Sequence, residues 1–246
     1  MNRRRHDPRL GAGAVPTGQT VHRGDEVVDV DFGGGVVAGG GIGGMQAALD
    51  LADSGFKVHM IQKDPSIGGT MSMLDKTFPT GDCSMCMISP KMVEVGRHPN
   101  IVLHTLAEVT AVDGEPGDFS VMVKEKPRFV DPVKCTGCGA CEKKCPKLVV
   151  SEFEQGLSKR KAIYSLLPQA VPNTRVIDPD TCLYIQRGRC KACEKFCDTG
   201  AINFEDTAKD YQLQVGAIIL SPGADRYDPK IRPELGFGRW SNVVTS

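Results

Sequence analysis

Short apolar segments alternate with glycine-rich turns along most of the chain. The first, Val36–Ala38, leads into a run of glycines, and Met45–Ala52 then consists of good helix formers. Ser54 and Gly55 are typical of a helix end, and Lys57–Ile61 is a second short apolar segment. The order strand, glycine turn, helix, strand predicts a parallel α/β unit of the Rossmann type.

Further strands are predicted in the middle of the chain and near its end. Ile101–His104 and Ala107–Val112 alternate apolar and polar residues, and glycine turns separate them from Phe119–Val123. Gln212–Ser221 is another apolar strand, and it also ends in a glycine turn. We therefore expect an α/β domain whose sheets are built from short strands.

Residues 1–27 differ from the rest, because Gly, Arg and Pro dominate them without hydrophobic periodicity. We predict a disordered tail there. Arg3, Arg4 and Arg5 suggest a twin-arginine signal, but no apolar segment follows them, so export is not expected. No run of ~18 apolar residues is present, so no transmembrane helix is expected. These features predict a cytoplasmic protein.

Composition narrows the function further. The 246 residues are enough for one large or two modest domains. Lys plus Arg (30) equals Asp plus Glu (30), so nothing predicts bulk attraction to nucleic acid or to an anionic membrane. Ten cysteines outside a secreted context favour metal ligation over disulfides.

Eight of these cysteines form two runs. The first is C-x2-C-x2-C-x3-C-P, the bacterial ferredoxin signature of a cubane iron–sulfur cluster. The second is similar, although a longer gap follows its first cysteine and Asp198 stands where proline is usual. Zinc is the rival metal, but structural zinc typically uses two separated C-x2-C pairs. We predict two [4Fe–4S] clusters held close together.

The fourth ligands are expected to cross over, because the last cysteine of each run ligates the other cluster in two-cluster ferredoxins. One predicted ligand set is Cys135, Cys138, Cys141 and Cys197. The other is Cys182, Cys190, Cys193 and Cys145.

The glycine run after Val36–Ala38 reads G-x-G-x-x-G. Gly39 permits a tight turn, Gly41 lets the backbone approach a pyrophosphate, and Gly44 allows close packing of helix on strand. The unpaired N–H groups of the helix N-terminus suit the phosphates. The alternative is a glycine-rich turn in an α/β unit that binds nothing. Gln62 stands where an acid usually holds the ribose, and it carries no charge.

A second glycine pair follows the second strand and favours FAD over NAD, because a loop there can lie along a flavin. The predicted FAD-binding residues in this part of the chain are Gly39, Gly41, Ile42, Gly43, Gly44, Gln62, Lys63, Gly68, Gly69 and Thr70.

Longer motifs carry a resemblance to a known family. They are GGGIGG, KDPSIGGTMSMLDKTFPT with DCSMC, PKMVEVGRHPNI, the two cysteine runs, PQAVP and DPDTCLY. Over about residues 36–246 the chain resembles the iron–sulfur flavoprotein subunit of heterodisulfide reductases. The resemblance implies a thioredoxin-reductase-like FAD domain with an inserted α+β ferredoxin domain that holds two clusters.

The resemblance also implies a division of the chain. The FAD domain would occupy residues 28–130, the ferredoxin insert residues 131–206, and the return to the FAD domain residues 207–246. Val109 would lie by the adenine, and Pro222 and Gly223 near the cofactor. The resembling proteins continue with further segments, so we expect the flavin domain here to be incomplete.

Cys83 and Cys86 leave three interpretations open. They are an inert buried pair, a redox disulfide, or, as the resemblance implies, ligands of a third iron–sulfur cluster. His98 and His104 are expected to be surface or structural residues, because nothing pairs them with a nucleophile. Six lysines flank the cluster cysteines and form either a solvated surface or a docking face for an acidic carrier: Lys134, Lys143, Lys144, Lys147, Lys191 and Lys195.

The predicted function is electron transfer between FAD and the two clusters in a heterodisulfide reductase-like complex. By resemblance the flavin bifurcates electrons, and the partners are other subunits of such a complex, linked to a hydrogenase or dehydrogenase, and a ferredoxin-type carrier. The alternative is an iron–sulfur relay or scaffold fragment without its own flavin. A flavin reductase that uses NAD(P)H directly is disfavoured, because no second G-x-G-x-x-G is present.

Overall fold

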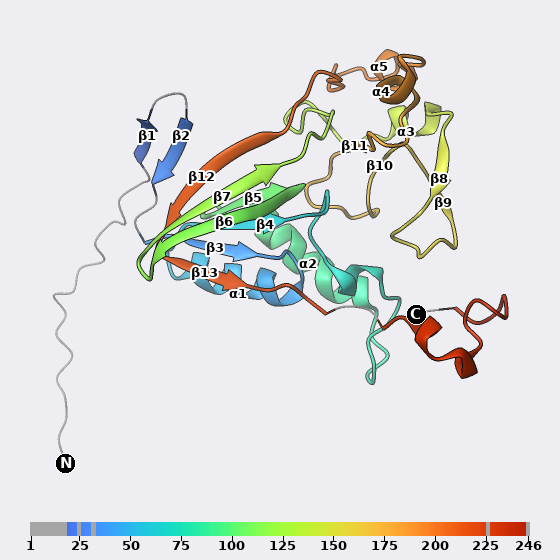
Figure 1. Ribbon diagram of the computed structural model, residues 1–246, viewed down its shortest axis with the longest axis horizontal. Helices are drawn as coiled ribbons and strands as arrows, with labels where there is room; N and C mark the ends of the chain where they lie inside the picture. Colours follow the sequence, from blue (N-terminus) through green and yellow to red (C-terminus); the bar gives the residue numbers. More distant parts are fainter. Residues whose placement is uncertain (1–18, 24–25, 31–32, 225–226, 245–246) are drawn as a thin grey trace.

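The computed structural model describes residues 19–23, 26–30, 33–224 and 227–244. Its centre is a four-stranded parallel sheet (Figure 1). In spatial order its strands are β13 (Ala217–Leu220), β3 (Gly35–Ala38), β4 (Val58–Gln62) and β5 (Ile101–Thr105). The predicted strand–turn–helix–strand unit is therefore present, with α1 (Ile42–Asp53) as its crossover helix.

Two helices, α1 and α2 (Ser84–Arg97), cover one face of this sheet, and the short helix η1 (Thr70–Met73) packs against α2. The buried side chains between helices and sheet are apolar: Val37, Met45, Ala48, Met60, Ile88 and Met92. Complete burial of one such aliphatic side chain stabilises the fold by about 1.5–3 kcal/mol, so this layer is a major part of the core.

A second sheet covers the other face. Its strands, in spatial order, are β1 (Gln19–Arg23), β2 (Glu26–Val30), β12 (Lys209–Val215), β7 (Asp118–Glu125) and β6 (Ala107–Glu115). Val36 and Ile61 of the parallel sheet pack against Val121, Val123 and Leu213 of this sheet. The fold thus has three layers, with helices on one side, the parallel sheet in the middle and the mixed sheet on the other side.

The predicted N-terminal tail is corrected in part. Residues 1–18 and 24–25 lie outside the described residues, but Gln19–Arg23 pairs antiparallel with Glu26–Val30. The second of these strands also runs parallel to β12, where Val28 pairs with Gln212. The sequence did not reveal this hairpin, because backbone hydrogen bonding to a sheet edge does not require hydrophobic periodicity.

The chain leaves the mixed sheet after β7 and returns to it at β12, and the segment between them holds the cysteine runs. Its two ends lie side by side, with Val130 bridged to Ile202. The Asp131 N–H donates to the Ala201 carbonyl at 2.7 Å. The elements in between are α3 (Ala140–Lys144), β8 (Leu148–Val150), β9 (Lys159–Lys161), β10 (Ile163–Tyr164), β11 (Val176–Ile177), α4 (Leu183–Arg187) and α5 (Ala192–Lys195).

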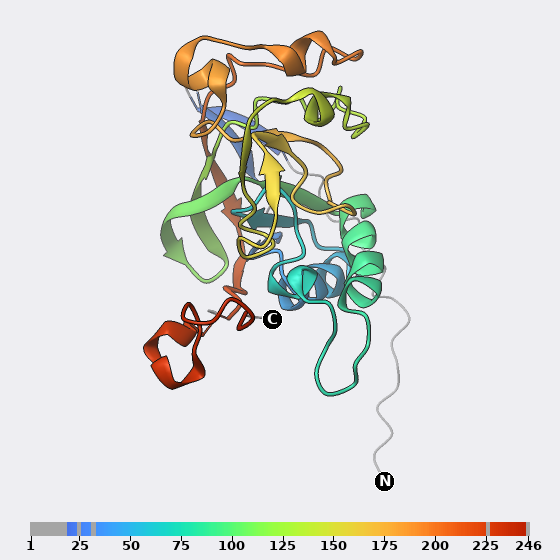
Figure 2. The same ribbon diagram turned by 90° about the vertical axis from the view of Figure 1, so that its right-hand side faces the viewer.

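Figures 1 and 2 place α3, α4 and α5 at the opposite end of the molecule from α1 and α2. After β13 the chain continues into two short helices, η2 (Pro229–Ile231) and η3 (Pro233–Leu235). No helix in the described ranges is long and apolar enough to cross a lipid bilayer.

Candidate flavin and cluster sites

The turn after β3 and the first turn of α1 each have one position that only glycine can occupy. Gly39 has φ +114°, and a Cβ there would lie 2.1 Å from the carbonyl oxygen of Ser221. A Cβ on Gly44 would lie 1.9 Å from the carbonyl oxygen of Gly39. Helix α1 therefore packs directly on the strand end, as the motif predicts.

Gly41 is different, because a Cβ there would meet no protein atom within 4 Å. It is the N-cap of α1, and no side chain hydrogen-bonds to the first turn of that helix. The first N–H groups of a helix have no partner within the helix and carry its positive dipole end. Open space beside such donors fits an anionic pyrophosphate, so the residues present suit a dinucleotide.

The second glycine pair lies against this turn. The Gly68 N–H donates to the Gly40 carbonyl at 2.8 Å. A Cβ on Gly69 (φ +57°) would lie 2.9 Å from the Cα of Gly41. The two glycine loops, separated in sequence by a helix and a strand, thus form one continuous backbone surface that begins at α1 and ends at Thr70 of η1.

Gln62 holds this surface in place. Its buried side-chain carbonyl accepts the Gly40 N–H at 2.7 Å, and its NH2 group donates to Asp64 at 2.7 Å. Asp64, which was not among the predicted site residues, brings a carboxylate to the strand end where Gln62 itself is uncharged. A signal for it was present, because an acid two residues beyond a Rossmann strand stands close to the usual ribose position.

The remaining predicted flavin residues come from other strands. The Ser221 N–H donates to the Ala38 carbonyl at 2.8 Å, so the turn with Pro222 and Gly223 begins beside the first glycine loop. Val109 lies on β6, opposite Val123 of β7. Strand β6 starts near Asp64, whose carbonyl accepts the Leu106 N–H at 3.0 Å.

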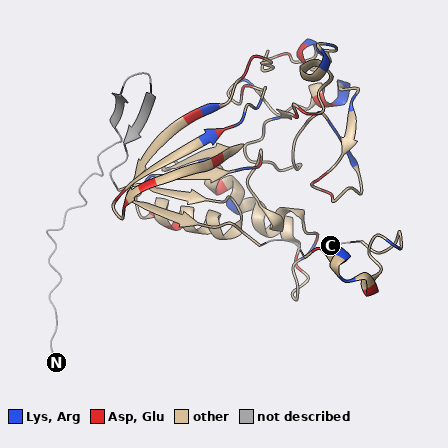
Figure 3. Cartoon of the chain, viewed as in Figure 1, with Lys and Arg blue, Asp and Glu red and all other residues tan. Residues whose placement is uncertain are grey.

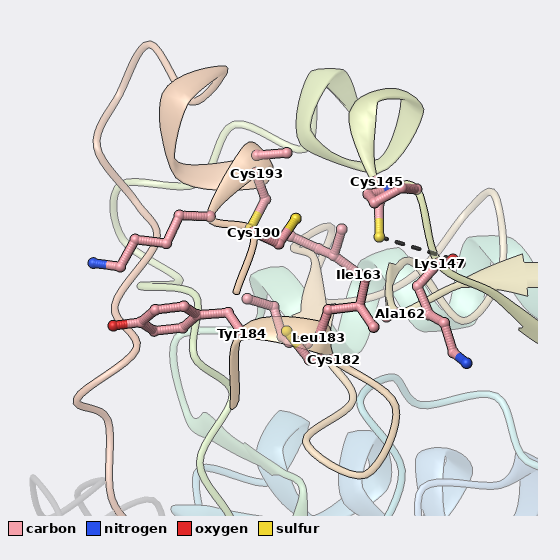
Figure 4. Close-up of a pocket in the computed structure, with 13 residues that line it drawn as sticks. Cys145, Lys147, Ala162, Ile163, Cys182, Leu183, Tyr184, Cys190 and Cys193 are labelled. Carbon is pink, nitrogen blue, oxygen red and sulfur yellow. Dashed lines mark hydrogen bonds between the residues drawn. The ribbon is translucent and has the colours of Figure 1, made fainter. Parts of the chain in front are cut away.

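Four cysteines line one apolar pocket in the inserted segment, and they include the predicted crossover ligand. They are Cys145, Cys182, Cys190 and Cys193. Figure 4 shows these side chains around a common space, with Ile163 and Ala162 on its wall. Cys145 belongs to the first run, yet the fold carries it to the cysteines of the second.

The other predicted set gathers around Cys141. Burial, together with the neighbouring Cys135 and Cys197, raises the pKa of the Cys141 thiol to about 11. Cys197 therefore lies within electrostatic reach of the first run. Burial likewise raises the pKa of Cys193 to about 12, with Cys182 and Cys145 among the contributing neighbours. Cys138 is exposed at the surface of its loop.

Within the described part of the chain, no three Cys, His, Asp or Glu side chains converge to hold a single metal ion. A structural zinc site needs such convergence in a tetrahedron. The thiolates of a cubane bind different corners of the cluster instead, so separated thiols around a common space suit an iron–sulfur cluster better.

The lysines near the cysteines do not form a uniform basic face. Lys134 pairs with Asp131 at 3.6 Å, and Lys191 pairs with Glu194 at 3.5 Å. Figure 3 shows acidic and basic segments interleaved at this end of the molecule. Ordinary solvated surface is therefore the better interpretation of Lys143, Lys144, Lys147 and Lys195.

A buried arginine joins the inserted segment to the parallel sheet. Arg128 donates to the hydroxyls of Thr174 (2.9 Å) and Thr105 (2.6 Å) and to the Pro65 carbonyl (3.0 Å). Burial lowers the pKa of its guanidinium. Asp206 accepts the Arg128 backbone N–H at 2.9 Å, which ties the start of the insert to its end. No sequence motif indicates this arrangement, because its partners are dispersed along the chain.

Cys83 and Cys86 are both exposed, which disfavours the inert buried pair. Cys83 caps α2, and its sulfur accepts the Cys86 N–H at 3.2 Å. A hydrogen bond from the Cys86 side chain lowers the pKa of Cys83, and the same contact raises the pKa of Cys86. The redox disulfide and the further cluster are both compatible with this geometry.

His104 is structural, as expected, and it is partly buried between the two sheets. Its Nε2 lies 3.0 Å from Nδ1 of His59, and the Tyr211 hydroxyl lies 2.6 Å from its Nδ1. Burial, together with the neighbouring His59, lowers the pKa of His104 to about 3. His98 instead pairs with Asp53 at 3.2 Å near the surface.

The fold and the two sites define a class of protein, an iron–sulfur flavoprotein. The family model described as FAD-dependent oxidoreductase matches residues 36–82, and that of the 4Fe–4S binding domain matches residues 128–151. The predicted fold class, with a Rossmann-like FAD domain and a ferredoxin-type insert, is confirmed. FAD and at least one iron–sulfur cluster are the supported cofactors.

The particular family follows from curated relatives. One subunit of the H2:CoB-CoM heterodisulfide,ferredoxin reductase of Methanothermobacter marburgensis is 49% identical over 85% of this chain and 31% of its own length. An iron-sulfur subunit of the CoB–CoM heterodisulfide reductase of Methanopyrus kandleri is 51% identical over 86% of this chain and 31% of its own length. The chain is thus homologous to the iron–sulfur flavoprotein subunit of heterodisulfide reductases over this region, and it spans about a third of those relatives.

Solved structures resemble this chain only weakly. The L-proline dehydrogenase of P. horikoshii is 22% identical, covers 41% of this chain and 20% of its own, and has a TM-score of 0.34. A likeness of this size supports no functional conclusion.

Proposed function

We propose that this chain transfers electrons between FAD and two [4Fe–4S] clusters in a heterodisulfide reductase-like complex. FAD exchanges electrons in pairs or singly, and each cluster carries one electron. The protein's own residues bind these groups and fix their spacing, because no acid–base or nucleophilic constellation accompanies them in the described residues.

The observation that carries the proposal is the position of Cys145. It lines one pocket with Cys182, Cys190 and Cys193, although its own run lies about 40 residues earlier. Exchange of the fourth ligand between two runs is the arrangement of a two-cluster ferredoxin domain. Cys197, near Cys141, supports the reciprocal exchange.

Cluster assembly would also remove protons from this region. The pKa values of Cys141 (about 11) and Cys193 (about 12) keep these thiols protonated near neutral pH. Cluster irons bind the thiolate form, so loading of the sites is coupled to proton release. The Cys197 sulfur differs from these two, because it accepts the Ala201 N–H at 3.2 Å and this hydrogen bond favours the thiolate.

FAD would be held by the two glycine loops. The N-terminus of α1 at Gly41 would bind the pyrophosphate, and the Gly68-Gly69 backbone would lie along the flavin. Gln62 orients the first loop through Gly40, and Asp64 supplies the acceptor that ribose hydroxyls need. Val109, Pro222 and Gly223 remain predicted contacts at the edges of this surface.

The partners belong to the same proposal. The relatives' names describe subunits, so other subunits and a ferredoxin-type carrier are the proposed partners. Some relatives' names join heterodisulfide and ferredoxin after a single named donor, as in the H2:CoB-CoM heterodisulfide,ferredoxin reductase. This supports extending the proposal to flavin-based electron bifurcation, with one electron sent to each acceptor.

Cofactor content of the anaerobically purified chain is the test. About eight irons and about one FAD per chain are expected, since each cubane holds four irons. Eight irons without FAD, even after FAD is added, would replace this proposal with a relay or scaffold role. Bifurcation is tested separately in the assembled complex, where ferredoxin reduction should stop when the heterodisulfide is withheld.

A further inference from the structure

The two cysteine runs contain a local repeat. Residues 138–145 read CGACEKKC and residues 190–197 read CKACEKFC, so Gly139 corresponds to Lys191 and Glu142 corresponds to Glu194. The backbones also agree: Gly139 (φ +77°, ψ 6°) and Lys191 (φ +63°, ψ 20°) are both left-handed N-caps of short helices. The repeat therefore places equivalent groups beside the two cluster sites.

Each glutamate of the repeat pairs with a cation, but the two cations come from different places. Glu194 pairs with Lys191 of its own loop, at 3.5 Å, and the Lys191 side chain is 41% exposed. Glu142 pairs at 2.9 Å with Arg175, which lies between the runs and is only 14% exposed. A buried charge is less screened by water and salt than an exposed one.

Gly139 makes room for this arginine. A Cβ at that position would lie 2.9 Å from an Nη atom of Arg175, so the guanidinium lies against the peptide between Cys138 and Cys141. The Arg175 Nε is buried and lies 2.9 Å from a carboxylate oxygen of Glu142. The contact therefore holds the guanidinium as one half of a charge pair beside the cysteine loop.

The segment around Arg175 is also fixed to the flavin domain. Arg128 donates to the Thr174 hydroxyl and, on its other side, to Thr105 of β5. Asn173 packs on Gly137, where an added Cβ would lie 2.7 Å from its carbonyl oxygen. Alternate residues of this extended segment thus contact the first cysteine loop and the flavin domain, which holds Arg175 in one position.

We propose that the buried positive charge of Arg175 raises the reduction potential of the cluster of the first run. This cluster is the one bound by Cys135, Cys138, Cys141 and Cys197, and the inference rests on the proposed function. Reduction adds one electron to a cluster that is already anionic, and a nearby buried cation stabilises the added charge. The electron comes from the flavin in the complex, or from dithionite in the test.

The test is an anaerobic redox titration of the purified chain, followed by electron paramagnetic resonance of both clusters. R175Q should lower the midpoint potential of the cluster of the first run. The expected fall of about tenfold in its reduction equilibrium constant corresponds to about 59 mV for one electron. The midpoint of the other cluster should stay the same. R175K should retain most of the wild-type value, and K191Q, at the equivalent but exposed cation, should shift its own cluster less.

G139A provides an independent variant that removes no charge. Its Cβ would displace the guanidinium, while Lys191 shows that a side chain is tolerated in the equivalent left-handed conformation. In G139A the midpoint potential of the cluster of the first run should lie between the values of the wild type and R175Q. Full iron content in R175Q and G139A with both midpoints unchanged would overturn the inference alone. A wild-type chain that holds only one cluster would overturn the inference and the proposed function together.

Discussion

The backbone N–H of Val171 donates to the hydroxyl of Ser66 at 2.9 Å. In return the Val171 carbonyl accepts the N–H of Ile67 at 3.0 Å. Ser66 stands just before the flavin loop, whereas Val171 lies in the long segment between the two cysteine runs. Leu167 and Ala170 of that segment are buried in the same core cluster as residues of α1 and α2. The extra length between the runs therefore docks the ferredoxin insert on the flavin domain.

Replacement of Ser66 by Ala should weaken this docking. The hydroxyl is buried, and its removal leaves the Val171 N–H without an acceptor, which costs about 1–3 kcal/mol. Urea denaturation measures the change. Ser54→Ala is the control, because the Ser54 hydroxyl makes a backbone hydrogen bond at an exposed position, and its loss should cost under about 0.5 kcal/mol. Equal losses in the two variants would contradict the docking role.

Replacement of Arg128 by Met should loosen the base of the inserted segment, where its two ends lie side by side. The change leaves three buried acceptors without their donor, for a total loss of about 2–5 kcal/mol. Limited proteolysis should then cut near residues 126–131 and 201–206 before the flavin domain is cut. Arg97→Met, at an exposed position on α2, should show neither effect. An Arg128→Met variant with wild-type protease resistance would show that the base of the inserted segment does not depend on this side chain.

Replacement of Gly41 by Ala should separate FAD binding from folding. The new methyl meets no protein atom within 4 Å but fills space beside the α1 N-terminus, so FAD affinity should fall about tenfold or more. The free energy of unfolding should stay within about 0.5 kcal/mol of wild type. Gly44→Ala should instead lose both stability and FAD, because its Cβ would lie 1.9 Å from the Gly39 carbonyl. Unchanged FAD affinity in Gly41→Ala would place the pyrophosphate elsewhere.

Pairs of cysteine substitutions test the ligand crossover. Cys145→Ser combined with Cys190→Ser should remove one cluster, because both residues belong to one predicted set, and about four irons should remain. Cys145→Ser combined with Cys138→Ser should remove both clusters. If ligands did not cross over, these two outcomes would be exchanged. Iron analysis and low-temperature spectra of the reduced proteins distinguish the cases.

Stability should fall in acid partly because of His104. Its pKa is about 3 in the fold and near 6.5 when unfolded, so the unfolded chain binds this proton first as the pH drops. The contribution of neutral His104 to the free energy of unfolding is complete above about pH 6.5. About 2 kcal/mol of it is lost by pH 5, and the loss continues down to about pH 3. His104→Phe should flatten this dependence in urea unfolding at pH 7 and pH 5. An unchanged slope would show that His104 does not remain neutral in the fold.

The predictable parts of the sites are those encoded by short, contiguous motifs. Gly39, Gly41 and Gly44 have distinct steric roles that follow from their spacing, and the structure places Gly39 and Gly44 at close backbone contacts. Asp64, Arg128 and Arg175 could not be found in this way. Each acts through partners from distant segments, and a single charged residue carries no pattern that marks it as buried.

The sequence by itself determined the chemistry: two cysteine runs for iron–sulfur clusters, a glycine turn for a dinucleotide, and a family resemblance that joined them in one flavoprotein. It did so because ligand spacing and glycine conformations are local properties. The tertiary structure alone decided how the parts are connected. It paired strand β2 with β12, brought Cys145 to the second run, and placed the guanidinium of Arg175 over Gly139. Burial and long-range pairing fix these contacts, and both depend on the whole chain.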